Sequence, residues 1–261
     1  MASSVPLRLA LLGGFALRKG SHDIAVAAGG RRLIALLALH NRPLARMRAA
    51  GILWPEFSTK RSLADLRTTL WRVNQSGEDI VTATQSTLAL SPDVDVDVLK
   101  LIALTRRLDQ AAVGLARIDL DSVTPAELTG DLLPDWYEEW VQDERESLRQ
   151  IRLHGLETLA VALSRAGRHA AAIQAALAAV CIEPLRETAH RTLIEAHLAE
   201  GNWPEARRQF EECRRLLWEE LEVEPSESMR GLMKPEPVFA GSHMLRSGAA
   251  PATRIPAPRR H

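Results

Sequence analysis

The chain has 261 residues, enough for about two domains of ordinary size, and its 46% hydrophobic and 25% charged residues indicate a globular protein rather than a disordered one. The net charge of zero conceals an asymmetry, because residues 1–92 carry 12 Lys and Arg against 5 Asp and Glu, whereas residues 93–233 carry 16 against 27. The sequence has no secretory signal pattern and no apolar run of about 20 residues, so we expect a cytoplasmic protein without a membrane partner. The charge asymmetry indicates that only the first part of the chain faces a polyanion.

The first 55 residues are expected to form a small sheet and two helices. Residues 7–18 contain strand-like runs broken by a Gly-Gly pair, and residues 24–26 form a second short strand. A compact apolar helix follows at 33–39, and a second helix at about 45–53 is stopped by a proline.

The next stretch, residues 60–75, has the pattern of an amphipathic helix. Its apolar residues are three or four positions apart, which places them on one buried face: Leu63, Leu66, Leu70 and Val73. The opposite face is rich in cations and hydrogen-bonding groups: Arg61, Arg67, Thr68, Trp71, Arg72 and Asn74. Such a face suits the phosphate-lined groove of DNA. The alternative is an ordinary solvated helix.

Other residues around this helix are interpreted structurally. Asp65 follows Ser62 by three residues, a spacing that predicts a cap at the start of the helix. Trp54, just before a proline, is expected in the core. Two interpretations stay open for Trp71, which either packs in the core or contacts the sugar and phosphate groups of DNA.

A hairpin is predicted after this helix. Residues 80–83 and 87–90 are strand-like and flank a short polar turn. A small sheet, three helices and a hairpin form the order of a winged helix-turn-helix, in which the third helix enters the major groove and the hairpin is the wing. This wing has no Lys or Arg between residues 79 and 92, so Thr82 and Thr84 can offer only uncharged hydrogen bonds to phosphate.

The second half of the sequence is predicted to be helical. Alternating Val and Asp over 93–97 suggest a last exposed strand, which leads into a helix at 98–108. Residues 111–130 show little regularity. A long helix follows with Pro134 at its first position, and its N-terminal part covers residues 136–154.

An internal repeat supports a stack of helical hairpins. Gly167 and Gly201 are 34 residues apart, and small or apolar residues follow each at matching positions: Ala172 and Ala206, Ala176 and Phe210, Ala179 and Cys213. This period is typical of tetratricopeptide hairpins, whose small residues let two helices approach closely. Helices at 98–108, 136–154 and 215–221 are expected to complete the stack. From residue 234 on, Pro, Gly and Arg predominate and predict a disordered tail.

Two groups of motifs resemble one family. The segments LLGGFALRKG, LIALLALHNRPLARMRAAGILWPE and PDVDVDV, with the register of Leu66, Arg67, Leu70 and Trp71, resemble the N-terminal half of the SARP family of bacterial transcriptional activators. LLPDWYEEW resembles the entry of the bacterial transcriptional activator domain. The resemblance implies a winged-helix DNA-binding domain of the OmpR/PhoB type over 1–97 and a helical activator domain over 98–233, ahead of the tail at 234–261. The expected fold is therefore mainly α with a small β component.

The predicted DNA contacts come from three parts of the winged helix. We expect Arg67 to contact a base and Arg72 a phosphate, because the N-terminal part of a recognition helix lies closest to the base edges. Arg46 and Arg48 are added to the predicted contacts because cations at the start of a helix favour phosphate binding. The full set is Lys60, Arg61, Arg67, Thr68, Arg72, Asn74, Arg46, Arg48, Thr82 and Thr84. Family members commonly carry Arg where this chain has Asn74.

The sequence shows no constellation for catalysis, metal binding or cofactor binding. No GxxxxGK is followed by Ser or Thr, so no phosphate loop is present. Cys181 and Cys213 lack a nearby partner and are predicted to be small buried residues. Three histidines are expected to be packed or solvated on helices rather than ligands: His154, His190 and His197.

The sequence therefore predicts a DNA-binding transcriptional regulator and no enzyme. The resemblance implies an activator that binds direct repeats in double-stranded promoter DNA, contacts RNA polymerase, and forms a homodimer on DNA through its helical domain. The alternative is a tetratricopeptide-type adaptor protein in which the winged helix serves assembly. We also expect a fragment ending near Leu99 to fold and bind DNA weakly.

Overall fold

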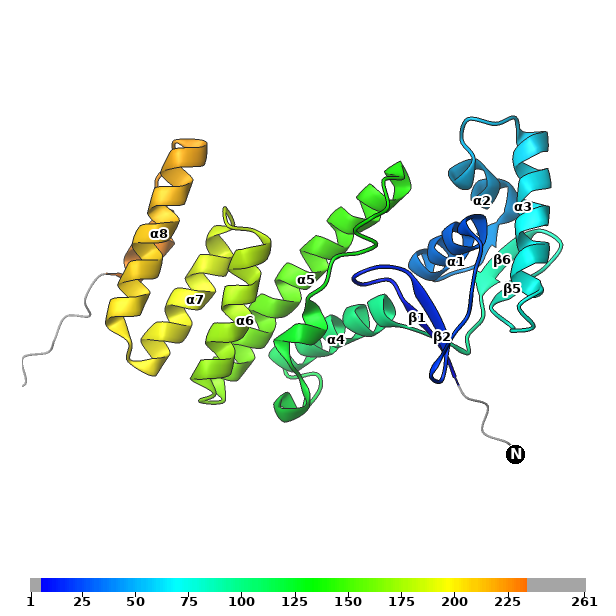
Figure 1. The fold of residues 1–261 in the computed structure, drawn as a ribbon. Coiled ribbons are helices and arrows are strands. Elements are labelled where there is room, and N and C mark those ends of the chain that lie inside the picture. Colours follow the sequence, from blue (N-terminus) through cyan, green and yellow to red (C-terminus); the bar gives the residue numbers. More distant parts are fainter. Residues whose placement is uncertain (1–5, 234–261) are drawn as a thin grey trace, which may run out of the picture.

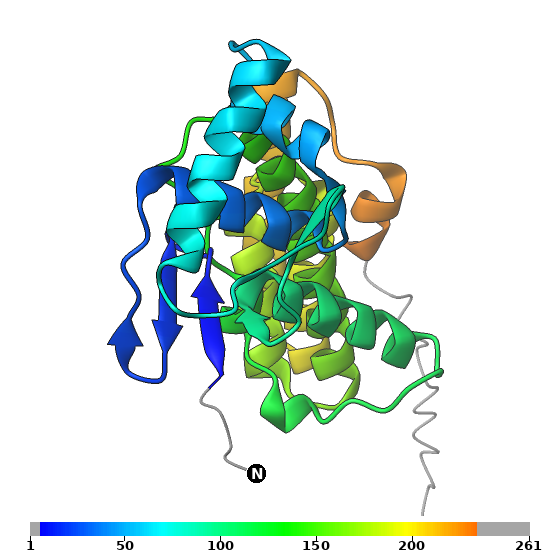
Figure 2. The same ribbon diagram turned by 90° about the vertical axis from the view of Figure 1, so that its right-hand side faces the viewer.

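The computed structural model of the chain describes residues 6–233, which form a winged-helix part and a row of helices (Figures 1 and 2). Within residues 6–233, the strands all lie before residue 97, and the part from 97 to 233 is helical or irregular. The prediction of a mainly α fold with a small β component, in which a winged helix-turn-helix precedes a tetratricopeptide-like row of helices, is confirmed. The predicted tail at 234–261 lies outside the described residues. No helix of residues 6–233 is long and apolar enough to cross a membrane.

A four-stranded sheet opens the chain. Its order is β3-β2-β1-β7, with β1 antiparallel to β2 and parallel to β7. The strands are β1 (Leu7–Ala10), β2 (Ala16–Lys19), β3 (His22–Asp23) and β7 (Val94–Val96). The prediction of a strand at 24–26 is wrong, because the strand that pairs with β2 is β3, which ends at Asp23. The prediction of an exposed last strand is also wrong, since Val94 and Val96 pack into the core while only the intervening Asp95 is partly exposed.

Three helices and a second small sheet complete the winged helix. The helices are α1 (Ala28–His40), α2 (Arg46–Leu53) and α3 (Thr59–Asn74). The sheet has the order β4-β6-β5, formed by β4 (Leu44–Ala45), β5 (Val81–Ala83) and β6 (Thr87–Leu90). The β5–β6 hairpin is the predicted wing. One leucine-rich cluster holds these elements together: Leu33, Leu36, Leu37, Leu44, Ala49, Ala50, Leu53, Leu66, Leu70 and Leu88.

The rest of the chain is a row of helices (Figure 1). These are α4 (Asp97–Ala112), α5 (Glu139–Arg165), α6 (His169–Ile182), α7 (Glu187–Glu200), α8 (Trp203–Leu221) and α9 (Glu227–Leu232). Two single-turn helices, η1 (Leu120–Ser122) and η2 (Pro125–Leu128), lie in the predicted irregular region. The predicted helix at 215–221 is the end of α8 rather than a separate element.

The predicted repeat is confirmed as two helical hairpins, the end of α5 with α6 and α7 with α8. The small residues at matching positions are at most 1% exposed: Ala172, Ala176, Ala179, Ala206 and Cys213. Burial raises the pKa of the Cys213 thiol to about 11. Cys181 is exposed, so the prediction that both cysteines are buried is wrong for this one.

Pro134 does not begin the long helix, which starts only at Glu139. Leu133 has a left-handed backbone with φ of 43°, and its amide donates to the carbonyl of Leu11 at 2.9 Å. The guanidinium of Arg145, inside α5, donates to the carbonyls of Leu132 at 2.7 Å and of Trp136 at 2.7 Å. The backbone ahead of α5 is therefore hydrogen-bonded to Leu11, just after β1, and to Arg145, instead of forming a helical turn.

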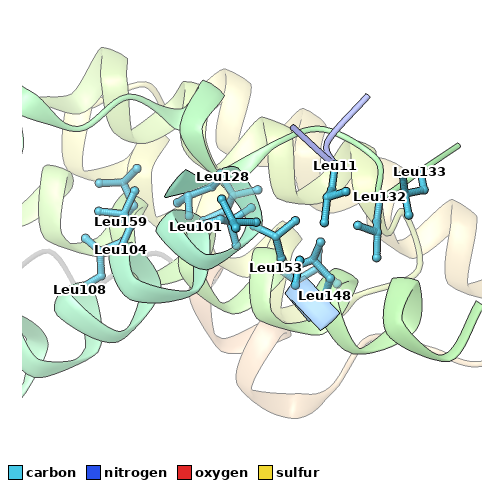
Figure 3. Close-up of a cluster of buried hydrophobic side chains, with 14 of the residues drawn as sticks. Leu11, Leu101, Leu104, Leu108, Leu128, Leu132, Leu133, Leu148, Leu153 and Leu159 are labelled. Atoms are coloured by element: carbon cyan, nitrogen blue, oxygen red, sulfur yellow. The ribbon is translucent and has the colours of Figure 1, made fainter. Parts of the chain in front are cut away.

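One carboxylate, that of Asp97, lies where the two parts meet. It accepts hydrogen bonds from the amides of Leu11 at 3.0 Å and Leu12 at 2.9 Å, and from the amide of Val98 at 2.7 Å at the start of α4. Leucines from the first sheet, α4, η2 and α5 form one buried cluster around this joint (Figure 3). A single apolar core therefore runs from β1 into the helical row.

Candidate nucleic-acid interface

The helix α3 is held by its apolar face and exposes the other (Figures 1 and 2). Leu66, Leu70 and Val73 are buried, at 1%, 7% and 3% exposure, while Leu63 is half-buried at the edge of the same cluster. The predicted apolar face is thus confirmed, with Leu63 at its margin. At about 25 cal/mol per Å² of buried apolar surface, each fully buried leucine stabilises the packing of this helix by about 2 kcal/mol.

A close approach between α1 and α3 was missed by the sequence reasoning. A Cβ atom placed on Gly30 would lie 2.8 Å from Cγ1 of Val26 and 3.0 Å from Cγ2 of Val73. The absence of a side chain at Gly30 therefore lets α3 cross closely over α1. Two polar residues of α3, Ser62 and Thr69, are buried by the same packing, at 3% and 8% exposure.

The predicted cap formed by Ser62 and Asp65 is wrong. The helix begins one turn earlier, at Thr59, and the Ser62 hydroxyl donates to the carbonyls of Trp54 and Ser58, each at 3.2 Å. Ser62 thus ties α3 to the turn that follows α2. Trp54 is half-buried and packs against the leucine cluster, as expected of a core residue.

Four cations lie on the exposed face of α3. Lys60, Arg61, Arg67 and Arg72 are all exposed, and within residues 6–233 none of them forms an ion pair. The guanidinium of Arg61 lies 3.9 Å from the ring centroid of Phe57, a cation–π contact that holds it at the helix start. The other three side chains extend into solvent with their full charge.

Three uncharged side chains share this face. Thr68 is exposed, and its hydroxyl donates to the carbonyl of Ala64 at 3.2 Å, which leaves the oxygen free to accept. Asn74 is exposed at the last turn. Trp71 is 61% exposed, so the interpretation in which it packs in the core is wrong.

The start of α2 adds a second group of cations beside the wing. The guanidinium of Arg46 donates to the carbonyl of Thr84 at 3.0 Å, and its amide donates to the carbonyl of Ser86 at 2.9 Å. Arg46 therefore holds the wing against α2, whereas Arg48 is exposed. Burial, and the positive charges of Arg42 and Arg48, lower the pKa of the His40 imidazole below its ordinary value.

The wing itself is uncharged, and Thr84, one of the two threonines predicted to contact DNA, is already hydrogen-bonded within the turn. The Thr84 hydroxyl accepts from the amide of Thr87 at 2.9 Å and lies 2.8 Å from the Thr87 hydroxyl, so it closes the turn. Thr82 is exposed on β5. The hairpin lies beside α3 (Figures 1 and 2), and β5 contacts that helix.

Two of the histidines predicted not to be ligands have other partners, whereas the buried Nδ1 of His197 has no hydrogen-bond partner within residues 6–233. His190 is fully buried between the carbonyl of Pro184, at 2.8 Å from Nε2, and the amide nitrogen of Gln209, at 2.6 Å from Nδ1. His154 lies 2.8 Å from the carboxylate of Asp109. Within the described part of the chain, no three His, Cys, Asp or Glu side chains are grouped so as to hold a metal ion.

Comparison with known proteins gives three matches. The family described as "Bacterial transcriptional activator domain" matches residues 104–235. The regulatory protein AfsR of Streptomyces griseus is 27% identical over 245 residues, which cover 89% of this chain and 25% of AfsR. A structure of Mycobacterium tuberculosis EmbR in complex with a low-affinity phosphopeptide superposes with a TM-score of 0.70 at 21% identity, over 87% of this chain and 64% of EmbR. At that identity the EmbR match concerns the fold alone, and the chain spans only a quarter of AfsR.

Proposed function

We propose that this chain, which belongs to the bacterial transcriptional activator domain family and has the two-part organisation of a SARP-type regulator, binds promoter DNA through α3 and activates transcription. The family supports a role in transcription regulation. The DNA contact itself is inferred from the exposed face of α3 and from the charge of the winged helix.

One observation carries the proposal: the cations of α3 have no carboxylate partner. Arg67 and Arg72 are exposed, unpaired within residues 6–233, and held in place by a helix whose other face is buried. An unpaired guanidinium attracts phosphate without first breaking an ion pair, and a fixed helix loses little entropy on binding. A set of such groups on one helix favours a polyanion as the ligand.

The geometry suggests a role for each part of the surface. With α3 in the major groove, Arg67 near the middle of the helix approaches a base edge, while Arg72 and Lys60 reach phosphates on either side. Arg48 on α2 extends the phosphate contacts. The uncharged wing contributes at most hydrogen bonds from Thr82, so most of the electrostatic attraction falls on α2 and α3.

The second step of activation is contact with RNA polymerase. We infer this from the family, since recruitment of polymerase is how a DNA-bound activator raises transcription. Binding to direct repeats as a homodimer is likewise part of the proposal.

The proposal is tested by fluorescence anisotropy with promoter fragments from the source genome, measured at two or more salt concentrations. The wild-type chain should bind some fragments selectively, with an affinity that falls as salt rises. The double substitution Arg67→Ala, Arg72→Ala should abolish this selective binding while circular dichroism shows unchanged helix content.

A matched control comes from α4, where Arg106 and Arg107 are also exposed and unpaired within residues 6–233. The substitutions Arg106→Ala and Arg107→Ala remove the same net charge from the chain but should leave DNA affinity nearly unchanged. Equal loss in both double variants would point to nonspecific attraction. Unchanged affinity in the α3 variant would remove this helix from DNA and favour the adaptor alternative.

A further inference from the structure

A cavity lies between α5, α6 and residues 129–132, the segment ahead of α5. Its volume is about 680 Å³, within the range of small-molecule sites in proteins. Apolar groups form part of the lining, among them Leu132, Leu148 and Ala178, of which the two leucines are labelled in Figure 3. Three arginines also line the cavity, so it combines an apolar wall with cations.

One of these arginines, Arg152, carries a buried charge and lacks a complete set of partners. The residue is only 7% exposed. Its Nε donates to the carbonyl of Leu128 at 3.4 Å and its Nη1 to the carboxylate of Asp131 at 3.1 Å, while its Nη2 has no partner within residues 6–233. The Asp131 side chain is itself 79% exposed. A buried guanidinium needs an anion beside it, and this one has a single carboxylate that solvent can reach.

The other two arginines of the cavity differ in their availability. Arg149 is bound by the carboxylates of Glu146 and Glu183. Arg145 has no carboxylate partner in the described part of the chain, and it donates instead to backbone carbonyls such as that of Leu132 at 2.7 Å. Uncharged carbonyls leave its positive charge in place. Arg145 and Arg152 are therefore the cations that a bound anion would meet.

Asp131 connects this cavity to the winged helix. Its carboxylate binds Arg152, and its backbone carbonyl accepts from the amide of Gly13 at 2.8 Å. Gly13 lies in the turn between β1 and β2. A change in what binds Arg152 is therefore one residue away from the first sheet of the winged helix.

We propose that the cavity binds a small organic carboxylate with an apolar body, and that this carboxylate replaces Asp131 on Arg152. A planar guanidinium pairs with both oxygens of a carboxylate, and the contact with Asp131 shows that the position accepts one. The apolar wall covers the rest of the ligand. Release of the Asp131 side chain changes the residue that holds Gly13, so the ligand acts on the winged helix. Binding does not require DNA and is measured without it.

Cys181 is an intrinsic reporter of the site, because it is exposed and lines the cavity. Cys213 is buried, and its pKa of about 11 keeps it protonated, so alkylating reagents modify Cys181 first. Iodoacetate carries a carboxylate and iodoacetamide is its neutral counterpart. The iodoacetate to iodoacetamide rate ratio at Cys181 should be at least about fivefold higher than at a control cysteine, because the arginines concentrate the anion.

The control cysteine comes from the double variant Gln174→Cys, Cys181→Ser. Gln174 is exposed two turns earlier on α6 and does not line the cavity. Arg152→Gln should lower the rate ratio at Cys181 to the control value, with helix content checked by circular dichroism. Equal ratios at the two cysteines of the wild-type and control chains would overturn the proposal.

NMR titration of the wild-type chain tests the site without any change to Arg152. At constant ionic strength, 4-phenylbutyrate should shift the amide resonances of Gly130 and Gly13 in a saturable way, with a dissociation constant of about 1 mM, whereas neutral 4-phenylbutyramide should not. Ala178→Leu fills the cavity and should weaken binding at least about tenfold. Ala170→Leu, at an exposed position of α6 outside the cavity, should leave the dissociation constant within about twofold.

Three NMR outcomes would contradict the proposal. An equal response to 4-phenylbutyramide, or binding that survives Ala178→Leu, would mean that neither the charge nor the cavity holds the ligand. An equal response to inorganic phosphate would show a general anion site in place of a carboxylate site. Shifts at Gly130 without shifts at Gly13 would disprove transmission through Asp131.

Discussion

Two arginines of α3 and one arginine at the start of α7 have opposite surroundings. On α3, Arg67 and Arg72 are exposed and have no carboxylate partner within residues 6–233. In the helical row, Arg186 donates to both oxygens of Glu157, at 2.8 and 3.2 Å, and this hydrogen-bonded carboxylate raises its pKa. The same residue type therefore stabilises the fold in one half and stays available to a ligand in the other. The two roles differ in whether a carboxylate lies beside the guanidinium, and not only in the net charge of each half.

The largest expected effect is the loss of stability when the paired arginine, Arg186, is removed. Arg186→Ala leaves the carboxylate of Glu157, only 14% exposed, with no guanidinium and just the Thr188 hydroxyl at 2.7 Å. We expect the free energy of unfolding to fall by about 2–4 kcal/mol, because a mostly buried charge loses its partner. Urea denaturation measures the change. Adding Glu157→Gln should recover part of it, and Arg67→Ala, the control from the other half, should change stability by less than about 0.5 kcal/mol.

The second effect is on DNA affinity. Arg67→Ala should weaken binding to the preferred site by about 1–3 kcal/mol and relax discrimination at one base pair, if its guanidinium reads a guanine edge. Arg72→Ala should weaken binding to all sequences alike and lower the salt slope by about one unit. Titrations against mutated sites at several salt concentrations separate the two. A uniform loss for both variants would assign both arginines to phosphate.

A smaller effect concerns the packing that fixes α3. Gly30→Ala places a methyl group within 3.0 Å of Val26 and Val73, so overpacking should outweigh the gain in helix propensity and cost about 1–2 kcal/mol of stability. Gly29→Ala is the control, because its new methyl would meet Thr69 at an ordinary 3.4 Å. Thermal melts should show only the Gly30 variant destabilised. Coincident melts would mean that α1 and α3 adjust without strain.

The smallest effect distinguishes two histidines by NMR titration. Burial is the first cause that lowers the pKa of both His40 and His190, but only His40 is also lowered by nearby arginines. Phosphates bound at Arg42 and Arg48 would offset that field, so DNA should raise the pKa of His40 and leave that of His190 unchanged. By linkage, DNA binding should tighten as pH falls through the titration of His40. Equal responses would argue against phosphate near α2.

The depressed pKa of His190 also sets the pH dependence of stability. Below pH 6.5, the ordinary pKa of histidine, the unfolded chain binds a proton that the folded chain binds less readily, because burial disfavours the charged imidazole and lowers the pKa of His190. Stability should therefore fall from about pH 6.5 down to the folded-state pKa and stay level above pH 6.5. Denaturation of His190→Gln across this range should show a flatter profile.

Much of the fold follows from local patterns in the sequence. The spacing of Leu66, Leu70 and Val73 predicted the buried face of α3, and the register of Ala172 and Ala206 predicted the two hairpins. The errors lie where distant residues decide. The start of α5 was predicted five residues too early. Hydrogen bonds to Leu11, far away in the sequence, and to Arg145, inside α5, hold the backbone around Pro134 out of a helix.

The candidate site was predictable to the same extent. Periodicity separated Arg67 and Arg72 from the buried face, because exposure on a helix depends on spacing alone. It could not show that Arg46 is held by the carbonyl of Thr84, or that Gly30 sets the distance between α1 and α3, since both depend on which elements meet in space.

The carboxylate of Asp97 has a consequence for how the molecule unfolds. It accepts hydrogen bonds from two amides just after β1 and from one amide of α4, and the apolar cluster around it is shared by both halves. Opening either half therefore exposes hydrogen bonds and leucines that belong to the other. In calorimetry the described residues should melt in one cooperative transition, and the amides of Leu11 and Leu133 should exchange with solvent only through global unfolding. A fragment ending near Leu99 would keep Asp97 but lose the Leu133 partner, and it should melt at a lower temperature with a smaller heat-capacity change.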